Sequence, residues 1–186
     1  MLIPVLIVAG VLLLLLAVFY NSLVSKRNSA DKAFASIDAM AKKRYDLIPN
    51  LVASVQQYMK HEKETLTQIT EMRARATSGN ISDEEKIDLD RKISRAVSGI
   101  MVAVENYPDL KASSNFLQLQ GSLNEVEEQL SAARRFYNAA VTDLNNAVQM
   151  FPTNIIASMF GFSTKQLFEI SEQERQNVDV KSLFTS

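Results

Sequence analysis

The sequence predicts an all-α protein in which an N-terminal transmembrane helix is followed by an elongated antiparallel bundle of three long helices plus a short C-terminal helix. No charged side chain precedes Lys26. Beyond that residue, apolar side chains recur every seven residues in three separate stretches, a pattern typical of helices that pack along a seam. Only five glycines and four prolines occur, and good helix formers dominate the rest.

The first helix is expected to cross a membrane. Residues from Leu2 to about Leu23 would rise roughly 30 Å as a helix, which matches the hydrocarbon thickness of a bilayer. A cleaved secretory signal is the alternative, but it requires a basic stretch before the apolar run and small residues before the cleavage site. The sequence lacks both features. We therefore expect an uncleaved single-pass anchor.

The residues that flank the apolar run predict its orientation. Lys26 and Arg27 follow it, and Tyr20 lies where an interfacial aromatic residue is expected. Because basic residues close to a span are retained on the cytoplasmic side, the N-terminus should lie outside and the body in the cytoplasm.

The clearest heptad pattern predicts a third long helix from Phe116 to Phe151. Five successive heptads stay in phase, with small alanines at several d positions. The residues expected in its seam are Leu123, Leu130, Ala133, Tyr137, Ala140 and Leu144.

A similar stripe predicts a first long helix from about Asn21 to Thr77. Its expected seam residues are Phe34, Ile37, Ile48, Pro49, Leu51, Val55 and Tyr58. Arg44 and Glu62 interrupt this stripe, so the core there should be either hydrated or paired. Pro49 removes one backbone hydrogen bond, and we expect a kink or a brief interruption at this point.

A shorter stripe predicts the second long helix, with Ile93, Ile100 and Tyr107 in its seam. Ser82 and Glu85 can form a capping box at its start, and Pro108 should end it. After Pro152 comes a short apolar segment that contains Ile155, Ile156, Met159, Phe160 and Phe162. We favour a helix that covers the end of the bundle, and the alternative is an interfacial or partner-binding patch.

Several polar groups of the sequence are candidates for a functional or structural role. Asn124, Ser131, Asn138 and Asn145 recur every seven residues, so they either set register against a neighbouring helix or subunit or form the solvent edge of the seam. The basic run Lys42-Lys43-Arg44 is expected to be a solvated face rather than a contact with lipid headgroups. Glu125, Glu127 and Glu128 are expected to form solvated i,i+4 or interhelical pairs, with Arg134 and Arg135 as nearby partners.

Enzymatic chemistry has little support in this sequence. It contains no cysteine and one histidine, His61, so a zinc site cannot be assembled. Phosphate-binding glycine loops and nucleophile elbows are also absent. A net charge of −1 gives no basis for nucleic-acid binding. We therefore expect no enzyme activity, no cofactor, no metal and no small-molecule substrate.

Three motifs resemble the bacterial LemA family: Arg44-Tyr45-Asp46-Leu47-Ile48-Pro49-Asn50-Leu51-Val52, Tyr107-Pro108-Asp109-Leu110-Lys111 and Ala133-Arg134-Arg135-Phe136-Tyr137-Asn138. The resemblance implies an N-terminal anchor and a long antiparallel helical bundle. Combined with the charge and hydropathy of the sequence, it gives an expected anchor over residues 1–25, a LemA-like helical bundle over 26–170 and a C-terminal tail over 171–186. It implies no catalytic residues. A related branch is associated with building magnetosome membranes, which suggests that such proteins organise membrane. The family's second Tyr-Asn pair is replaced here by Leu144-Asn145.

These observations favour a non-enzymatic scaffold in the bacterial cytoplasmic (inner) membrane, whose bundle self-associates to organise or shape the bilayer. The partners are then lipid and further copies of the chain. Phe34 and Ile37 in the membrane-proximal part of the first helix need cover from the third helix or from another subunit. The alternative is an accessory or adaptor subunit of another membrane protein, such as a protease or sensor kinase, which would bind through the segment from Ile155 to Phe162.

Overall fold

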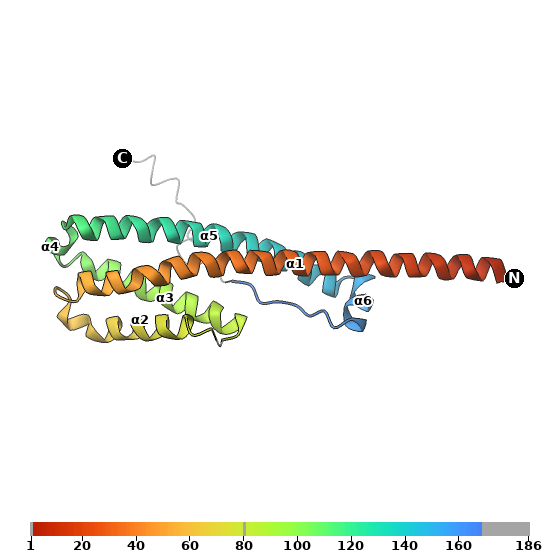
Figure 1. Ribbon diagram of the computed structural model, residues 1–186, viewed down its shortest axis with the longest axis horizontal. Coiled ribbons are helices and arrows are strands. Elements are labelled where there is room, and N and C mark those ends of the chain that lie inside the picture. The colour runs from red at the N-terminus through yellow and green to blue at the C-terminus, as the bar shows by residue number, and fades with distance from the viewer. Residues whose placement is uncertain (1, 80, 169–186) are drawn as a thin grey trace, which may run out of the picture.

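The computed structural model describes residues 2–79 and 81–168, and the described part is helical with no strand (Figure 1). Its elements in chain order are α1 (Leu2–Val55), the 3₁₀ helix η1 (Lys60–Glu62), α2 (Lys63–Ala76), α3 (Asp83–Val104), α4 (Pro108–Lys111), α5 (Ser114–Gln149) and α6 (Thr153–Met159). Successive long helices run up and down the same axis to form a rod. The expected C-terminal tail, 171–186, lies outside the described residues.

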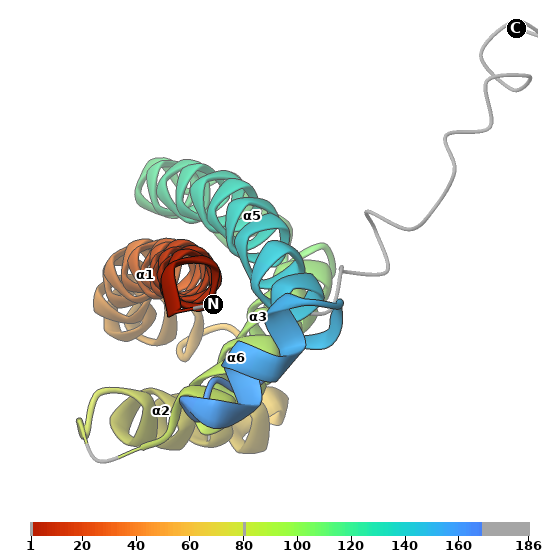
Figure 2. The same ribbon diagram turned by 90° about the vertical axis from the view of Figure 1, so that its right-hand side faces the viewer.

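The rod is formed by α1, α2, α3 and α5, as the view along its long axis shows (Figure 2). Helices α1 and α5 pack side by side over most of the rod, and α2 packs against α3. Toward its N-terminus α1 continues alone beyond the other helices, and the side chains of its first turns are exposed (Figure 1). This stretch is long and apolar enough to cross a membrane, and α1 is the one described helix that meets this condition.

Helix α1 passes through Pro49 without interruption, so the interrupted helix that was one of the two alternatives at this residue is wrong. Proline has no N–H to offer the carbonyl four residues earlier, which here belongs to Tyr45. Arg73 of α2 replaces that donor, because its Nε lies 2.8 Å from the Tyr45 carbonyl oxygen. The proline therefore leaves a carbonyl that helps to attach α2 to α1.

The break falls instead between Val55 and Lys63, so the first predicted helix is divided into α1 and α2. The chain turns there, with Met59 N–H donating to the Val55 carbonyl at 2.8 Å. Met59 is buried inside the turn, whereas Tyr58 is 42% exposed. Tyr58 thus does not lie in the seam that its heptad position predicted.

Local signals at the other helix ends agree with the sequence. Ser82 caps α3, because its Oγ accepts a hydrogen bond from Glu85 N–H at 3.2 Å. Gly79 just before it has φ +75, which favours glycine. Pro108 lies in the first turn of α4, and α5 ends at Gln149 shortly before Pro152.

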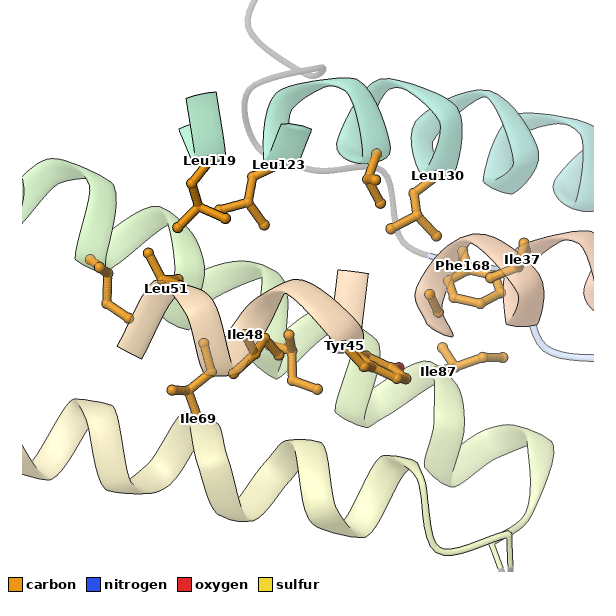
Figure 3. Packing of buried hydrophobic residues seen from close by; sticks show 14 of the residues in the cluster. Ile37, Tyr45, Ile48, Leu51, Ile69, Ile87, Leu119, Leu123, Leu130 and Phe168 are labelled. Carbon is orange, nitrogen blue, oxygen red and sulfur yellow. The ribbon is translucent and has the colours of Figure 1, made fainter. Parts of the chain in front are cut away.

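Most of the predicted seam residues form one continuous core (Figure 3). Eleven of them are buried: Phe34, Ile37, Ile48, Leu51, Val55, Ile93, Ile100, Leu123, Leu130, Tyr137 and Leu144. Tyr107, Ala133 and Ala140 are partly buried against this core, and Pro49 is exposed.

The membrane-proximal part of α1 finds its cover within the same chain. The ring of Phe34 lies 5.5 Å from that of Tyr137 on α5 and 6.3 Å from that of Phe168. Ile37 and Ala41 belong to the same core. These residues therefore do not require a second subunit.

Candidate functional site

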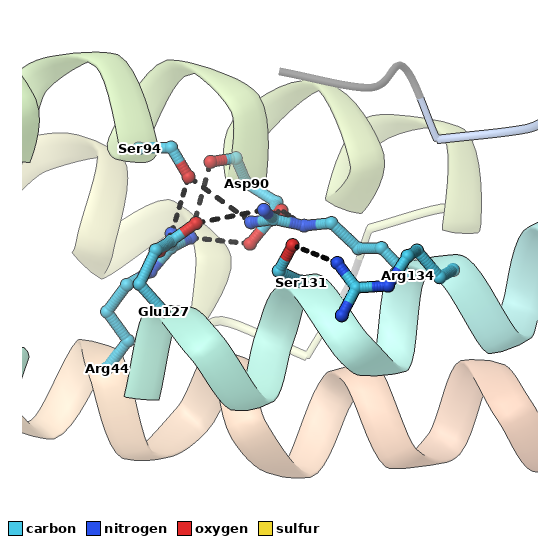
Figure 4. A network of polar contacts seen from close by, with 7 residues as sticks. Arg44, Asp90, Ser94, Glu127, Ser131 and Arg134 are labelled. Atoms are coloured by element: carbon cyan, nitrogen blue, oxygen red, sulfur yellow. Dashed lines mark hydrogen bonds and ion pairs between the residues drawn. The ribbon is translucent and has the colours of Figure 1, made fainter. Parts of the chain in front are cut away.

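A network of charged side chains lies inside the rod, where Arg44 interrupts the apolar stripe (Figure 4). Arg44 is 1% exposed. Its Nη2 donates to Oδ1 of Asp90 on α3, and its Nη1 donates to Glu127 Oε2 on α5 at 3.0 Å. Ser94 Oγ accepts a further bond from Nη1 at 2.6 Å. The expectation of a solvated basic run is thus wrong for Arg44, and the expectation of a paired core is confirmed.

Arg134 of α5 completes the network from the other side. Its Nη2 lies 2.7 Å from Asp90 Oδ2, and its Nη1 lies 2.9 Å from Glu127 Oε1. Burial alone would lower the pKa of Arg134, but the two carboxylates outweigh it and raise the pKa, so the guanidinium stays charged. Arg134 was an expected partner of Glu127, but the pair is partly buried and joins residues seven positions apart on one helix, which differs from the solvated i,i+4 or interhelical geometry that was expected.

Two arginines and two carboxylates from three helices therefore balance one another's charge. Such a cluster requires each helix to hold one axial position, because a shift would leave a buried charge without its partner. Arginine does not lose its proton in proteins, so this cluster is poorly suited to acid–base chemistry. The arrangement fixes the register of α1, α3 and α5.

The periodic asparagines of α5 hold the chain segment that follows α6. Asn138 Nδ2 donates to the Phe168 carbonyl and its Oδ1 accepts from Phe168 N–H, both at 2.9 Å. Asn145 makes the same two bonds with the backbone of Lys165, also at 2.9 Å. Seven helical residues rise about 10.5 Å and three extended residues span about 10 Å, so the two spacings match.

The sequence offered a neighbouring helix, a second subunit or solvent for these asparagines, and Asn138 and Asn145 contact this extended segment instead. Tyr137 adds a third contact, since its hydroxyl donates to the Gln166 carbonyl at 3.1 Å. Burial raises the pKa of Tyr137 to about 12, which keeps this donor protonated. The sevenfold spacing was a signal for the pairing, but it did not identify the partner.

Replacing Asn138 by leucine should release this segment. The change removes both side-chain bonds to Phe168 and leaves its backbone groups without these partners, at a cost of about 1 to 3 kcal/mol. Hydrogen exchange of the full-length protein in detergent should show faster exchange at the Phe168 amide. Asn124 is exposed and belongs to the same series of polar residues that recur every seven positions on α5, so Asn124→Leu is the matched control. Equal protection in both variants would contradict this assignment.

The second candidate region lies where α1 leaves the bundle. We call residues 150–162 the collar; it comprises α6 and the residues on either side. Ile156 and Ala157 of the collar pack with Leu23 of α1 in a separate apolar cluster, which Leu16 and Phe19 also join. The collar thus attaches the end of α5 to the last turns of the apolar run.

Aromatic contacts strengthen this attachment. The ring of Tyr20 lies 4.8 Å from that of Phe160 and 6.0 Å from that of Phe162. The Arg27 guanidinium lies 5.1 Å from the centre of the Phe162 ring, a favourable cation–π arrangement. The neighbouring Lys26 is partly exposed.

The structure separates the predicted partner surface into two groups. Ile156 is buried and Phe162 is partly buried, as expected of a helix that covers the end of the bundle. Ile155, Met159 and Phe160 are exposed, as expected of a contact patch. The segment therefore has one face that packs on α1 and one that remains available.

Metal-ligating side chains and pockets are the other features that could form a site in the described part of the chain. Among residues 2–79 and 81–168, no three His, Cys, Asp or Glu side chains form a group that could hold a metal ion. The side chain of His61 lies outside the described part. An open groove of about 540 Å³ lies near the turn between Val55 and Lys63, which we call the distal turn. Val52, Met59 and Leu66 contribute to the apolar lining of this groove, and Lys60 and Lys63 also line it.

Comparison with known proteins places the chain in a family. A model of the LemA family matches residues 33–182. Protein LemA of Metamycoplasma hominis is 29% identical over 163 residues, which cover 88% of this chain and 74% of that protein. Magnetosome protein MamQ 2 of Paramagnetospirillum magneticum is 29% identical over 80 residues, and MamQ of Magnetospirillum gryphiswaldense is 25% identical over 79. The magnetosome matches cover 43% and 42% of this chain but 29% of each relative. Because the family model matches most of the chain, the protein belongs to the LemA family.

Proposed function

We propose that this protein is a non-enzymatic scaffold that is anchored in the membrane and holds a rigid helical rod at the bilayer surface. The observation that carries the proposal is that the candidate span and the axis of the rod are one helix, α1, of 54 residues. A flexible linker between the two would let the body rotate freely, whereas a continuous helix transmits its orientation. The collar stiffens the junction, because it packs on α1 from Leu16 to Leu23.

The dimensions support a role in spacing or organising membrane. From Leu23 to Val55, α1 would extend about 48 Å beyond the span. The buried ion network and the long α1 and α5 pair keep this length straight. The likeness to proteins named for the magnetosome agrees with a membrane-organising role, which the LemA resemblance implies.

Energy transfer from single labels to headgroup acceptors tests the spacing. The chain has no cysteine, so Tyr58→Cys at the distal turn and Met159→Cys in the collar accept one label each. In proteoliposomes the Tyr58 label should transfer weakly, because the rod holds it far from the lipid, and the Met159 label should transfer strongly. Equal transfer from both sites would mean that the rod lies flat, and the spacing role would fail.

The membrane topology that we propose follows from the basic residues that flank the apolar run. Lys26 and Arg27, which follow the apolar run, favour a rod on the cytoplasmic side of the bacterial inner membrane and an N-terminus outside. Labelling of Tyr58→Cys in intact cells with a membrane-impermeant thiol reagent tests this orientation. Labelling without permeabilisation would overturn it.

Self-association is the second part of the proposal. Copies that share one bilayer and one orientation meet at high effective concentration, so weak contacts suffice. The rod surface offers Val102, Leu117 and Phe136, which are exposed apolar side chains on α3 and α5. Native electrophoresis of the full-length protein in mild detergent measures this directly, and a monomer at micromolar concentration would remove the self-association.

An accessory role for another membrane protein is the second candidate function. It is favoured by the exposed side chains of Ile155, Met159 and Phe160 in the collar. A photo-crosslinker at Phe160 in cells would recover a heterologous protein if the chain is an adaptor. Recovery of further copies of the same chain would support the scaffold.

A further inference from the structure

The collar combines exposed apolar side chains with an absence of charge. No charged residue occurs between Asp143 and Lys165. Five large apolar side chains of this segment are exposed: Met150, Phe151, Ile155, Met159 and Phe160, with Phe151 at 79%. Monomeric soluble surfaces seldom gather apolar residues in this way, so the collar is adapted to contact something other than water.

The position of the collar indicates what its exposed apolar side chains contact. Its buried face packs on Leu16, Phe19 and Leu23, which are the last turns of the apolar run of α1. Leu16 lies about 6 Å along the helix axis from Tyr20, on the side of the span. A bilayer that surrounds α1 up to Tyr20 therefore also reaches the collar.

Charged groups mark the aqueous side of the same region. Arg27 lies over the Phe162 ring at 5.1 Å, at the edge of the collar that faces the rod. Slightly farther along, Lys165 Nζ pairs with Asp31 Oδ1 at 2.7 Å. The boundary between uncharged and charged surface thus lies at the same level on α1 and on the chain after α6.

We propose that the collar is a second membrane contact, which inserts into the headgroup and upper acyl region of the bilayer that α1 crosses. Interfacial elements of other proteins bury their apolar side by about 5 to 10 Å, a depth that matches the level of Leu16. A lipid surface fits better than a protein partner, because the exposed side chains continue the apolar surface of the span at the same level.

A second contact has a mechanical consequence. A lone span can tilt and rotate in the bilayer, whereas two attached points on one rigid body fix its rotation. The collar therefore determines which side of the rod faces along the membrane. The inference rests on the proposed anchoring of α1, and the experiment below tests the two separately.

The chain contains no tryptophan, so single-tryptophan variants of the full-length protein report one site each. We compare Phe151→Trp in the collar, Leu13→Trp in the span and Phe136→Trp, which is 65% exposed on the rod. Each is reconstituted into phosphatidylcholine and phosphatidylglycerol vesicles with lipids brominated close to the headgroup or deep in the acyl chain. All three positions are exposed, so the fold should tolerate the changes.

The proposal expects blue-shifted emission and strong quenching by shallow bromine for Phe151→Trp. Leu13→Trp should be quenched most by deep bromine, and Phe136→Trp by neither. Quenching of Leu13→Trp without quenching of Phe151→Trp would overturn the collar contact while leaving the anchor intact. A blue shift at Phe151→Trp without quenching would indicate cover by protein, and this outcome also overturns it. If Leu13→Trp escapes both bromine positions, the anchoring itself is wrong.

Discussion

Asp90→Asn should lower the free energy of unfolding by about 3 to 5 kcal/mol, the usual cost of removing one partner from a buried ion pair. Asp90 is 3% exposed and accepts from both Arg44 and Arg134. Without its charge, two guanidinium groups would face one another inside the rod with only Glu127 to compensate them. Thermal or urea unfolding of the full-length protein in detergent, monitored by the far-UV circular dichroism of its helices, measures the loss of unfolding free energy.

Asp88→Asn provides the matched control. Asp88 lies on the same helix and also pairs with two cations, Arg91 and Lys92, but at the surface. Exposed ion pairs contribute little net stability because water and salt screen them, so this variant should remain close to the parent. The double variant with Arg44→Met should lose less than the sum of the single changes, because both act on one interaction. Equal losses at Asp88 and Asp90 would show that the network is not a buried structural element.

The seam of α5 and the long apolar start of α1, a candidate membrane span, could be predicted because both signals are local. Leu123, Leu130, Tyr137 and Leu144 follow a period that any helix with one buried side must show. The apolar run before Lys26 is likewise read from composition and length alone. Neither inference required knowledge of which residues would become neighbours.

The role of Arg44 could not be predicted in the same way. Its partner Asp90 lies 46 residues away, and the adjacent Lys42 and Lys43 made a solvated run the simpler interpretation. The interruption of the apolar stripe at Arg44 was the correct signal, since it predicted a hydrated or paired position. No helix end marks the boundary expected at residue 25, because α1 continues through it to Val55, and the sequence changes there only from uncharged to charged.

The turn after Val55 is the largest departure from the heptad pattern. The heptad phase resumes at Ile69 after the interruption at Glu62, so periodicity alone favoured one long helix. A single helix of that length would leave its distal half without a neighbour, whereas folding back lets α2 pack on α3. Tertiary burial therefore overrides local pattern here. Glu62, which interrupts the stripe, was the one local hint of the turn.

Ile48→Ala and Tyr58→Ala test that turn directly, because the heptad pattern places both residues in the seam. Ile48 is fully buried in the core of the rod, and its truncation leaves a cavity that should cost about 2 to 5 kcal/mol. Tyr58 is exposed at the turn, so its truncation should change stability by no more than about 0.5 kcal/mol. Unfolding of both full-length variants under the same detergent conditions gives the comparison. A cost at Tyr58 as large as that at Ile48 would mean that the seam does continue past Val55, and that α1 and α2 form one helix packed against another copy of the chain.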